Sequence, residues 1–518
     1  MKNLGFRNVG NVFWNLPTGA LYEAIVNRRE GLVAHKGPIV VRTGHQTART
    51  REDKFVVKDS ATDQHVWWGK ENHPFEQERF ESLYNRLKAY LQGKDIFIQD
   101  CYAGADPKYQ VPIRIITENA WHSLYARNMF IQIQDTEALK NHVPECTIIN
   151  VPRFHAFPEF DGTHSEAFVI VNFGKKIILI GGTSYAGEIK RSSFTVLNFS
   201  FLSEENILPM HCAANTGTGE QDDTAIFFGL SGTGKTALSM SSDRRLIGND
   251  EHGWSDHGVF NFEGGCYSRV ANLTSETNPF IFRCTERFGT ILENVSMNME
   301  TRRIDLSDTT LTDNTRATYH ISQIENSVAS GMGGHPKNIF MLTCDASGIM
   351  PPVARLSTEQ ALYYYLSGYT SKIESGRPTA TFDSCFGAPF QALSPLVYAR
   401  ILGEKIAKHN VKCWLINTGW VKGPCGVGER IDIRLSRAVV KEILSGRMDK
   451  ARMRKDPVFG FSVPEHCEGF PVELLNPKQN WKNSSEYDAL AQELAKQFKK
   501  HLEQFSSKIP VEIRKAGP

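Results

Sequence analysis

The sequence predicts an α/β protein built from two domains. At 518 residues the chain is too long for one small core, because domains average roughly 150 residues. Short apolar runs typical of strands alternate with helical patterns along the chain, as they do in α/β folds. A glycine-rich loop that suits a phosphate group directly follows one of these runs, so one domain is expected to bind a mononucleotide.

The strand-like runs fall into two groups. The first group lies before residue 205, at 38–42, 95–99, 111–117, 146–151, 168–171 and 176–180. The second lies beyond Pro209, where runs at 224–228, 338–343 and 412–417 accompany the glycine-rich loop. We therefore expect a boundary near residue 205, with domains at 1–205 and 206–518.

Near the end of the sequence, apolar residues recur every three or four positions between Tyr487 and Phe505, which predicts an amphipathic helix. Ser484 or Ser485 is placed to cap its start. A helix of this pattern either packs on its own domain or binds a partner, and we expect the first.

The composition is that of an ordinary soluble protein. Hydrophobic residues make up 41% of the chain and charged residues 22%, and the net charge is +2, so we expect small-molecule partners and no nucleic acid or membrane. No apolar run approaches the roughly 20 residues of a membrane span and no signal-like segment is present, which predicts a cytoplasmic location. The ten cysteines form no Cys-x-x-Cys pair, so reduced thiols are expected.

The glycine-rich loop has the pattern of a P-loop. Its residues are Gly229, Leu230, Ser231, Gly232, Thr233, Gly234, Lys235 and Thr236. The glycines let successive backbone N–H groups turn toward one anion, Lys235 supplies a positive charge for the outer phosphates, and the Thr236 hydroxyl can bind the Mg²⁺ that accompanies ATP. The alternative is a glycine-rich turn with a chance Gly-Lys-Thr, which the preceding strand disfavours.

A second motif follows the P-loop at 246–254, where an apolar run ends in Asp250 and Glu251. P-loop enzymes place a metal-binding carboxylate at the end of such a strand, so Asp250 is the candidate metal ligand. An Asp-Glu pair after a strand is commonly a solvated turn, so the interpretation depends on its position after the P-loop.

Taken in order, the motifs resemble those of ATP-dependent phosphoenolpyruvate carboxykinase. They are Arg42-Thr43-Gly44, the run from Gly181 to Glu188, Met210-His211-Cys212, the two motifs above, Asn314-Thr315-Arg316 and Gly426-Val427-Gly428. The resemblance implies a two-domain fold with a P-loop mononucleotide-binding domain and an active site in the cleft between domains. Residues 1–205 would bind the substrate, and 206–518 would bind the nucleotide and carry a lid loop at 372–386. The implied reaction of gluconeogenesis converts oxaloacetate and ATP into phosphoenolpyruvate, ADP and CO2, a lyase activity.

The resemblance also assigns roles at the matching positions. Arg49 matches an arginine that binds the substrate carboxylate, and Arg316 matches one that holds the transferring phosphoryl group. A planar guanidinium suits both roles because it offers two parallel donors, although either arginine alone would more commonly form a surface salt bridge. His211 and Asp250 match ligands of a second metal ion, manganese, which stabilises the enolate left by CO2. A lone histidine such as His211 is usually a core residue, so its ligand role depends on the match.

Together these matches give the predicted site. The residues are, for catalysis, Arg49, Lys190, Arg191, Lys235, Asp250, Arg269 and Arg316; for ATP, Gly229, Ser231, Gly232, Thr233, Gly234, Lys235, Thr236, Arg316, Arg430, Ile431 and Ser436; for the substrate, Arg49, Tyr185, Lys190 and Arg316; and for metal ions, Thr236, His211 and Asp250. Of these, Arg430, Ile431 and Ser436 match the segment that encloses the nucleotide base.

The chain departs from the family pattern at the second metal. Arg191 stands where the family has a lysine that, when neutral, donates its amine to the metal ion. Arginine cannot do so, because its pKa exceeds about 12 and it offers no lone pair. Asn249 stands where the family has an aspartate, which removes one negative charge, whereas Arg269 replaces a phosphate-contacting lysine and keeps the charge. The second metal is therefore either lost or bound differently.

The lid and the substrate pocket also differ. The lid loop, 372–386, is shorter than that of the family and lacks its Gly-Thr-Glu start. Because lids exclude water, a shorter lid would expose a reactive intermediate to protonation or hydrolysis. Ser184 replaces a tryptophan and Ala48 replaces a glycine, so the pocket is expected to have changed shape.

Three functions remain open at this point. The leading hypothesis is an ATP-dependent phosphotransferase on the carboxykinase fold that acts on a small anionic acceptor, because the ATP residues remain while the second-metal site is altered. The second is the conventional carboxykinase reaction, and the third is a non-catalytic protein that senses ATP. ATP and Mg²⁺ are the expected cofactors of the enzyme. Mn²⁺ at the altered site, the acceptor and the oligomeric state are left open.

Overall fold

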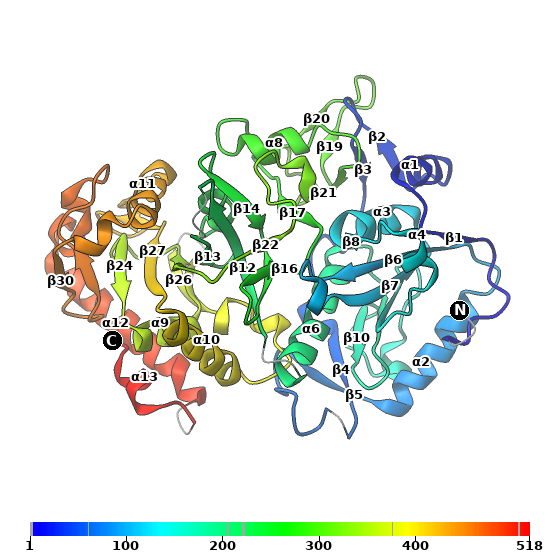
Figure 1. The fold of residues 1–518 in the computed structure, drawn as a ribbon, viewed down its shortest axis with the longest axis horizontal. Coiled ribbons are helices and arrows are strands. Elements are labelled where there is room, and N and C mark those ends of the chain that lie inside the picture. Colours follow the sequence, from blue (N-terminus) through cyan, green and yellow to red (C-terminus); the bar gives the residue numbers. More distant parts are fainter. Residues whose placement is uncertain (1–3, 61, 205–206, 220–222, 375–376, 506–507) are drawn as a thin grey trace. The chain divides into compact units, whose positions relative to one another are not determined.

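The computed structural model describes residues 4–60, 62–204, 207–219, 223–374, 377–505 and 508–518 (Figure 1). The chain forms two compact units. The first consists of Met1–Glu205, Phe260–Gly331 and Pro389–Leu393, and the second of Asn206–Val259, Met332–Ala388 and Ser394–Pro518. Both units combine sheets with helices, so the predicted α/β class is confirmed.

These units divide the chain differently from the predicted domains at 1–205 and 206–518. The first unit takes in Phe260–Gly331, which was assigned to the second domain by sequence. The reason is strand pairing, because Ile291 and Glu293 pair in register with Ile39 and Val41. A pairing between strands about 250 residues apart leaves no local pattern in the sequence.

A large mixed sheet is the centre of the first unit. Its strands, in spatial order, are β1 (Val12–Trp14), β6 (Ile96–Ala103), β7 (Val111–Thr117), β9 (Cys146–Val151), β11 (Ile177–Gly181), β10 (Phe168–Asn172), β4 (Lys54–Lys58) and β5 (His73–Glu76), with β8 (Ile131–Gln132) paired to β6. The β9, β10 and β11 strands are buried along their whole length, as expected for runs of Ile and Val that are covered on both faces.

A smaller sheet completes this unit. It has the order β17 (Gly265–Arg269), β21 (Arg316–His320), β18 (Ile291–Glu293), β3 (Ile39–Val41) and β2 (Gly31–Val33). Helix α3 (Ala120–Met129) contacts β6 and β7 of the large sheet and β17 and β21 of the small one (Figure 1). The other helices of the unit are α1 (Thr18–Asn27), α2 (Gln77–Tyr90), α4 (Thr136–Lys140), α5 (Pro158–Asp161), α6 (Gly187–Glu204) and α8 (Pro279–Cys284). A short strand pair joins β19 (Ser296–Met297) to β20 (Ile304–Asp305).

The second unit is organised around another mixed sheet. Its order is β22 (Met332–Gly333), β16 (Val259–Asn261, of which Val259 belongs to this unit), β15 (Glu251–Trp254), β12 (Leu208–Gly217), β13 (Ala225–Phe228), β23 (Asn338–Thr343), β27 (Lys412–Asn417), β24 (Val353–Leu356), β31 (Ser462–Pro464) and β30 (Met453–Lys455), with β14 (Arg244–Gly248) paired to β12. The central strands β13, β23 and β27 run parallel. The P-loop follows β13 and therefore starts from the middle of the sheet.

Helices surround this second sheet. They are α7 (Lys235–Ser239), α9 (Thr358–Ser367), α10 (Pro395–His409), α11 (Ile433–Leu444), α12 (Ser484–Leu502) and α13 (Val511–Lys515). The predicted C-terminal helix is α12, and its Phe498 contacts Tyr364 and Tyr369 of the same unit. The predicted caps Ser484 and Ser485 lie inside the first turn, because the Asn483 side chain accepts hydrogen bonds from the backbone N–H groups of Ser485 and Glu486.

The second unit also contains two short hairpins. One is made of β28 (Trp420–Val421) and β29 (Glu429–Arg430). The other, β25 (Tyr369–Glu374) and β26 (Arg377–Phe382), occupies most of the predicted lid loop, 372–386. The lid segment is thus an antiparallel hairpin in which Ser371 pairs with Ala380, and not an irregular loop. Residues 375–376 of the predicted lid lie outside the described residues.

All ten cysteines are free thiols, and all but Cys425 are buried. This agrees with the expectation of reduced structural thiols. Among the described residues, none of the helices has the length and apolar character needed to cross a membrane.

The core of the second unit gives a stability prediction. Val353 in β24 is fully buried, whereas Val427 is 70% exposed. We expect Val353→Ala to lower the free energy of unfolding of this unit by about 1.5–3 kcal/mol, and Val427→Ala to change it by less than about 0.5 kcal/mol. Urea denaturation of both variants measures the difference. Equal losses would show that β24 does not belong to a packed core.

Candidate active site

The conformation of the P-loop is fixed by its own residues. Gly232 and Gly234 have φ angles of +89° and +88°, which side chains other than glycine rarely adopt. A Cβ atom on Gly229 would lie 2.4 Å from Thr233 Oγ1, so the loop also needs glycine there for space. The Thr233 hydroxyl donates to the Leu230 carbonyl at 2.8 Å and fixes the turn.

Lys235, at the start of α7, makes two polar contacts beside the P-loop. Its Nζ lies 2.7 Å from Asp250 Oδ1 and 3.1 Å from His211 Nε2. His211 Nδ1 is 3.5 Å from the same Asp250 oxygen. The antiparallel pairing of β12 with β15 sets His211 opposite Glu251, which brings both beside Asp250. The structure therefore gathers the predicted residues His211, Lys235 and Asp250 at one place.

His211, Asp250 and Glu251 form a donor set that fits a divalent metal ion. Their ligand atoms all lie within 4.8 Å of one another. One imidazole and two carboxylates suit Mn²⁺ or Mg²⁺. Glu251 was not among the predicted ligands, although its position directly after Asp250 in the sequence could have indicated it. The predicted ligand Thr236 lies in the first turn of α7, next to Lys235.

The altered position Asn249 lies just before this donor set. Its side chain is buried, with 5% exposure, and its Oδ1 has no hydrogen-bond partner within the described part of the chain. An aspartate there would bury an additional negative charge beside Asp250. The asparagine leaves the donor set with one carboxylate fewer nearby, which weakens its attraction for cations.

The predicted base-binding segment reaches the P-loop through Arg430. Its guanidinium donates to the Gly232 carbonyl at 3.0 Å and to the Thr418 carbonyl at 3.2 Å. Ile431 and Ser436 are buried, and Ile431 packs in the core of the second unit. The structure thus sets Arg430 against the P-loop, while Ile431 is a core residue.

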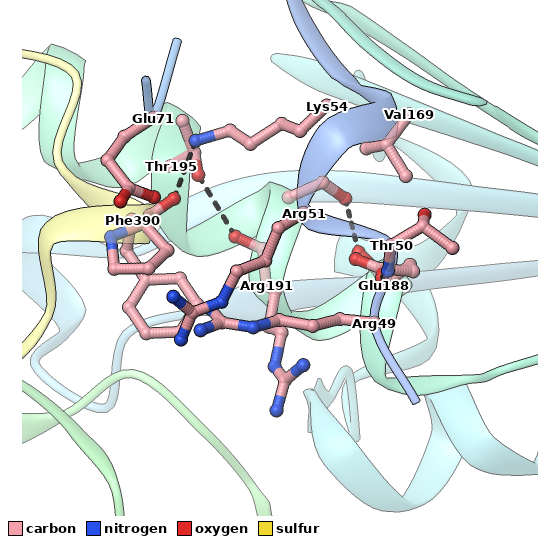
Figure 2. Close-up of a pocket in the computed structure, with 12 residues that line it drawn as sticks. Arg49, Thr50, Arg51, Lys54, Glu71, Val169, Glu188, Arg191, Thr195 and Phe390 are labelled. Carbon is pink, nitrogen blue, oxygen red and sulfur yellow. Dashed lines mark hydrogen bonds between the residues drawn. The ribbon is translucent and has the colours of Figure 1, made fainter. Parts of the chain in front are cut away.

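A basic pocket lies in the first unit (Figure 2). Arg49, Arg51 and Arg191 bring their guanidinium groups together in it, and Lys54 lies above them in the view. Four basic side chains face two carboxylates, those of Glu71 and Glu188, so the pocket is suited to an anion. The rest of the lining is Thr50, Val169, Ser192, Thr195, Pro389 and Phe390.

Glu188 is the buried carboxylate at the base of this pocket. It accepts a hydrogen bond from the Thr50 backbone N–H at 3.1 Å, which anchors the segment that carries Arg49. Burial raises its pKa, while Arg191 and Arg49 act in the opposite sense. Arg49 also lies over the Phe390 ring, 5.8 Å from its centroid. Glu188 was not predicted as a site residue, although it belongs to the motif that ends at this position.

Lys54 is a partly buried lysine beside the arginines. Its Nζ donates to the Pro389 carbonyl at 2.6 Å and to Asn72 Oδ1 at 3.2 Å. Burial lowers its pKa to about 8, with Arg49 acting in the same sense and Glu71 in the opposite one. The positive charge of Lys54 is therefore present below pH 8 and is lost above it.

Arg191 and Arg316 approach two neighbouring tyrosines. Arg191 lies over the Tyr185 ring at 5.5 Å, and Arg316 lies over the Tyr267 ring at 5.3 Å. Tyr267 donates to the buried Glu293 at 2.9 Å. Burial raises the pKa of Glu293 to about 8, although the hydrogen bond and the two arginines lower it in part. The predicted residues Tyr185, Arg191 and Arg316 are thus grouped around a carboxylate that the sequence did not point to.

The remaining predicted residues of the first unit contact polar side chains of the same unit. Lys190 forms a buried ion pair with Glu263 at 2.8 Å, in which both side chains are 4% exposed. Arg316 is oriented by Asn314 Oδ1 at 2.8 Å, and Asn314 in turn donates to the Thr47 carbonyl. Arg269 pairs with Asp313 near the surface. Glu263 carries no signal in its local sequence, because its partner is more than 70 residues away.

The P-loop follows a parallel strand and has a metal donor set beside it. These features define a P-loop nucleotide-binding protein of the α/β class. Comparison with known families is more specific. The family model described as phosphoenolpyruvate carboxykinase matches residues 10–473. The chain therefore belongs to the phosphoenolpyruvate carboxykinase family, as predicted from its motifs.

Several relatives match over the full length. The phosphoenolpyruvate carboxykinase (ATP) of Geotalea uraniireducens is 54% identical, and the match covers 99% of this chain and 97% of the relative. The enzymes of the same name from Pelobacter propionicus and Thermus thermophilus are 52% and 48% identical, with at least 98% of each chain covered. This confirms the predicted family, whose members use ATP, a divalent metal ion and small anionic substrates.

The titration of Lys54 gives a testable pH dependence. Because Lys54 loses its charge above pH 8, we expect oxalate, a small dianion, to bind between about threefold and tenfold more weakly at pH 9 than at pH 7. Lys54→Arg keeps its charge and should reduce this change. Ionisation of Glu293 at pH 9 also weakens oxalate binding, but it does so equally in both proteins. The difference between the two proteins therefore isolates the effect of Lys54. Calorimetric titration at both pH values measures the effect, and an identical pH dependence in the two proteins would rule Lys54 out as its source.

Proposed function

We propose that this protein catalyses the ATP-dependent carboxykinase reaction. Oxaloacetate and ATP would give phosphoenolpyruvate, ADP and CO2. The observation that carries the proposal is the full-length match to enzymes named phosphoenolpyruvate carboxykinase (ATP) at about half identity. The P-loop, the donor set beside Lys235 and the basic pocket around Arg49 support it, because the reaction needs a nucleotide, a cation and an anion site.

In this proposal the basic pocket binds a carboxylate of oxaloacetate. Arg49 offers two parallel N–H donors, and Glu188 holds the Arg49 segment through Thr50. The C–C bond to the departing carboxylate breaks, CO2 leaves, and the electron pair remains on the enolate oxygen. Arg191 adds a fixed positive charge, which favours a dianionic substrate in this pocket.

Phosphoryl transfer follows. The enolate oxygen bonds to the γ-phosphorus of ATP, and the bond from that phosphorus to its bridging oxygen breaks, so that ADP leaves. Lys235 and the N–H groups of the P-loop would hold the phosphates, and Arg316, oriented by Asn314, would stabilise charge on the transferring group. A divalent ion bound by His211, Asp250 and Glu251 would supply further positive charge to these oxygens.

Arg191 makes one change to this scheme. It lies over Tyr185 and lines the basic pocket, so its contacts are those of an anion-binding residue. Since a guanidinium has no lone pair, the protein would hold its metal ion with His211, Asp250 and Glu251 and without a ligand from position 191.

A second candidate function rests on Arg191 and Asn249, the two positions that depart from the family pattern at the second metal. Arg191 brings a fixed positive charge to the basic pocket, and Asn249 leaves one carboxylate fewer beside Asp250, and neither change favours a second metal ion. An ATP-dependent phosphotransferase that acts on another small anion would need the P-loop and the basic pocket but no decarboxylation. It would transfer phosphate from ATP without forming CO2.

Phosphorus NMR of the purified protein with ATP, Mg²⁺, Mn²⁺ and oxaloacetate tests both functions. We expect phosphoenolpyruvate and ADP to form in equal amounts. Arg49→Gln should lower kcat/KM for oxaloacetate by about 10- to 100-fold, because it removes a charge-assisted contact to the substrate. Arg283→Gln, which breaks a surface ion pair with Glu325, is the matched control and should have no effect.

The other outcomes separate the alternatives. ADP formation only with a different small acid would favour the phosphotransferase. Tight ATP binding without turnover of any acid would favour a non-catalytic ATP sensor.

A further inference from the structure

A second group of metal-ligating side chains lies in the first unit, apart from the P-loop donor set. It consists of Glu52, His73 and His164. Glu52 lies in a short 3-10 turn, Arg51–Asp53, His73 is the first residue of β5, and His164 lies between α5 and β10. Strand pairing assembles them, because β4 lies between β5 and β10 and pairs with both. Three separate segments thus meet at the edge of the large sheet.

The geometry of this group is close to that of a metal site. The three ligand atoms lie within 4.8 Å of one another, and His73 Nε2 is 4.0 Å from Glu52 Oε2. The two imidazole rings stand nearly perpendicular, with centroids 5.1 Å apart. Phe55 packs against both rings, at 6.0 Å from His73 and 5.0 Å from His164, and so supports them from one side.

Hydrogen bonding leaves one nitrogen of each histidine for a ligand. His164 Nδ1 contacts the Glu52 backbone carbonyl, which is only an acceptor, so Nδ1 carries the proton and Nε2 keeps a lone pair. Metal-binding histidines commonly have this arrangement. His73 Nε2 is buried and has no hydrogen-bond partner within the part of the chain that the structure describes. An isolated surface pair of histidine and glutamate explains neither feature.

We propose that Glu52, His73 and His164 bind a zinc ion. Two imidazoles and one carboxylate are a set that Zn²⁺ prefers, and a water molecule would complete a tetrahedron. Ligand atoms in such a tetrahedron are about 3.3 Å apart, so the group needs only a modest contraction. The Glu52 side chain is 78% exposed and can supply that movement.

The consequence concerns the basic pocket. Glu52 follows Arg49 by three residues, so a zinc ion would fasten the Arg49 segment to β5 and to the segment before β10. The zinc ion would therefore act as a structural clamp next to an anion-binding arginine.

Competition between the full-length protein and a chromophoric chelator for Zn²⁺ tests this proposal. Because the donor set around Asp250 can also bind a divalent ion, all variants carry Asp250→Asn as a common background. We expect one zinc ion to bind in this background. His73→Ala with His164→Ala should weaken that binding by on the order of 100-fold or more, and Glu52→Gln by about tenfold.

The matched control is His155→Ala. His155 pairs with Glu166 at 3.2 Å on the surface of the same unit and belongs to no group of three ligands among the described residues. Its loss should leave zinc affinity unchanged. Unaltered zinc affinity in the double histidine variant would overturn the proposal. If that variant fails to fold, Glu52→Gln decides the question, because its exposed side chain can be changed without disturbing the core.

Discussion

The basic side chains of this protein depend on buried or half-buried carboxylates that hold them in place before any anion is bound. Arginines and lysines gathered for phosphate or carboxylate ligands repel one another. In the first unit Glu188 lies among Arg49, Arg191 and Lys54, and Glu263 pairs with Lys190. In the second unit Asp250 accepts from Lys235 at 2.7 Å. A ligand that enters either place meets cations that are already oriented, which reduces the cost of arranging them.

The same balance of charge explains why Arg191 and Asn249 matter. Arg191 adds a fixed positive charge to the basic pocket, and Asn249 adds no negative charge beside Asp250. On the proposed function, the first change favours anions in the pocket and the second reduces the attraction for cations at the donor set. His211, Asp250 and Glu251 still offer three ligand atoms, so a divalent ion has a place without help from position 191. This is why we favour the family reaction over a different acceptor, with an altered metal requirement as its main peculiarity.

Several strands and the P-loop grouping could be predicted from local sequence, whereas contacts between distant segments could not. The runs at Val111–Thr117, Cys146–Val151 and Asn338–Thr343 are strands with the predicted bounds, because buried β-branched and aromatic residues mark them. The grouping of Lys235 with Asp250 follows from the P-loop motif. The partners Glu188 and Glu263, and the inclusion of Phe260–Gly331 in the first unit, arise from contacts between distant segments, which leave no periodic pattern.

The most direct test of the central claim is the Mn²⁺ dependence of phosphoenolpyruvate formation in the natural protein and in Arg191→Lys, at constant oxaloacetate and Mg-ATP. If Arg191 binds the substrate anion and repels a cation, Arg191→Lys should lower the Mn²⁺ concentration for half-maximal rate by about tenfold and raise KM for oxaloacetate. Adding Asn249→Asp should lower the Mn²⁺ requirement further. An unchanged Mn²⁺ requirement together with an unchanged KM would contradict the role assigned to Arg191.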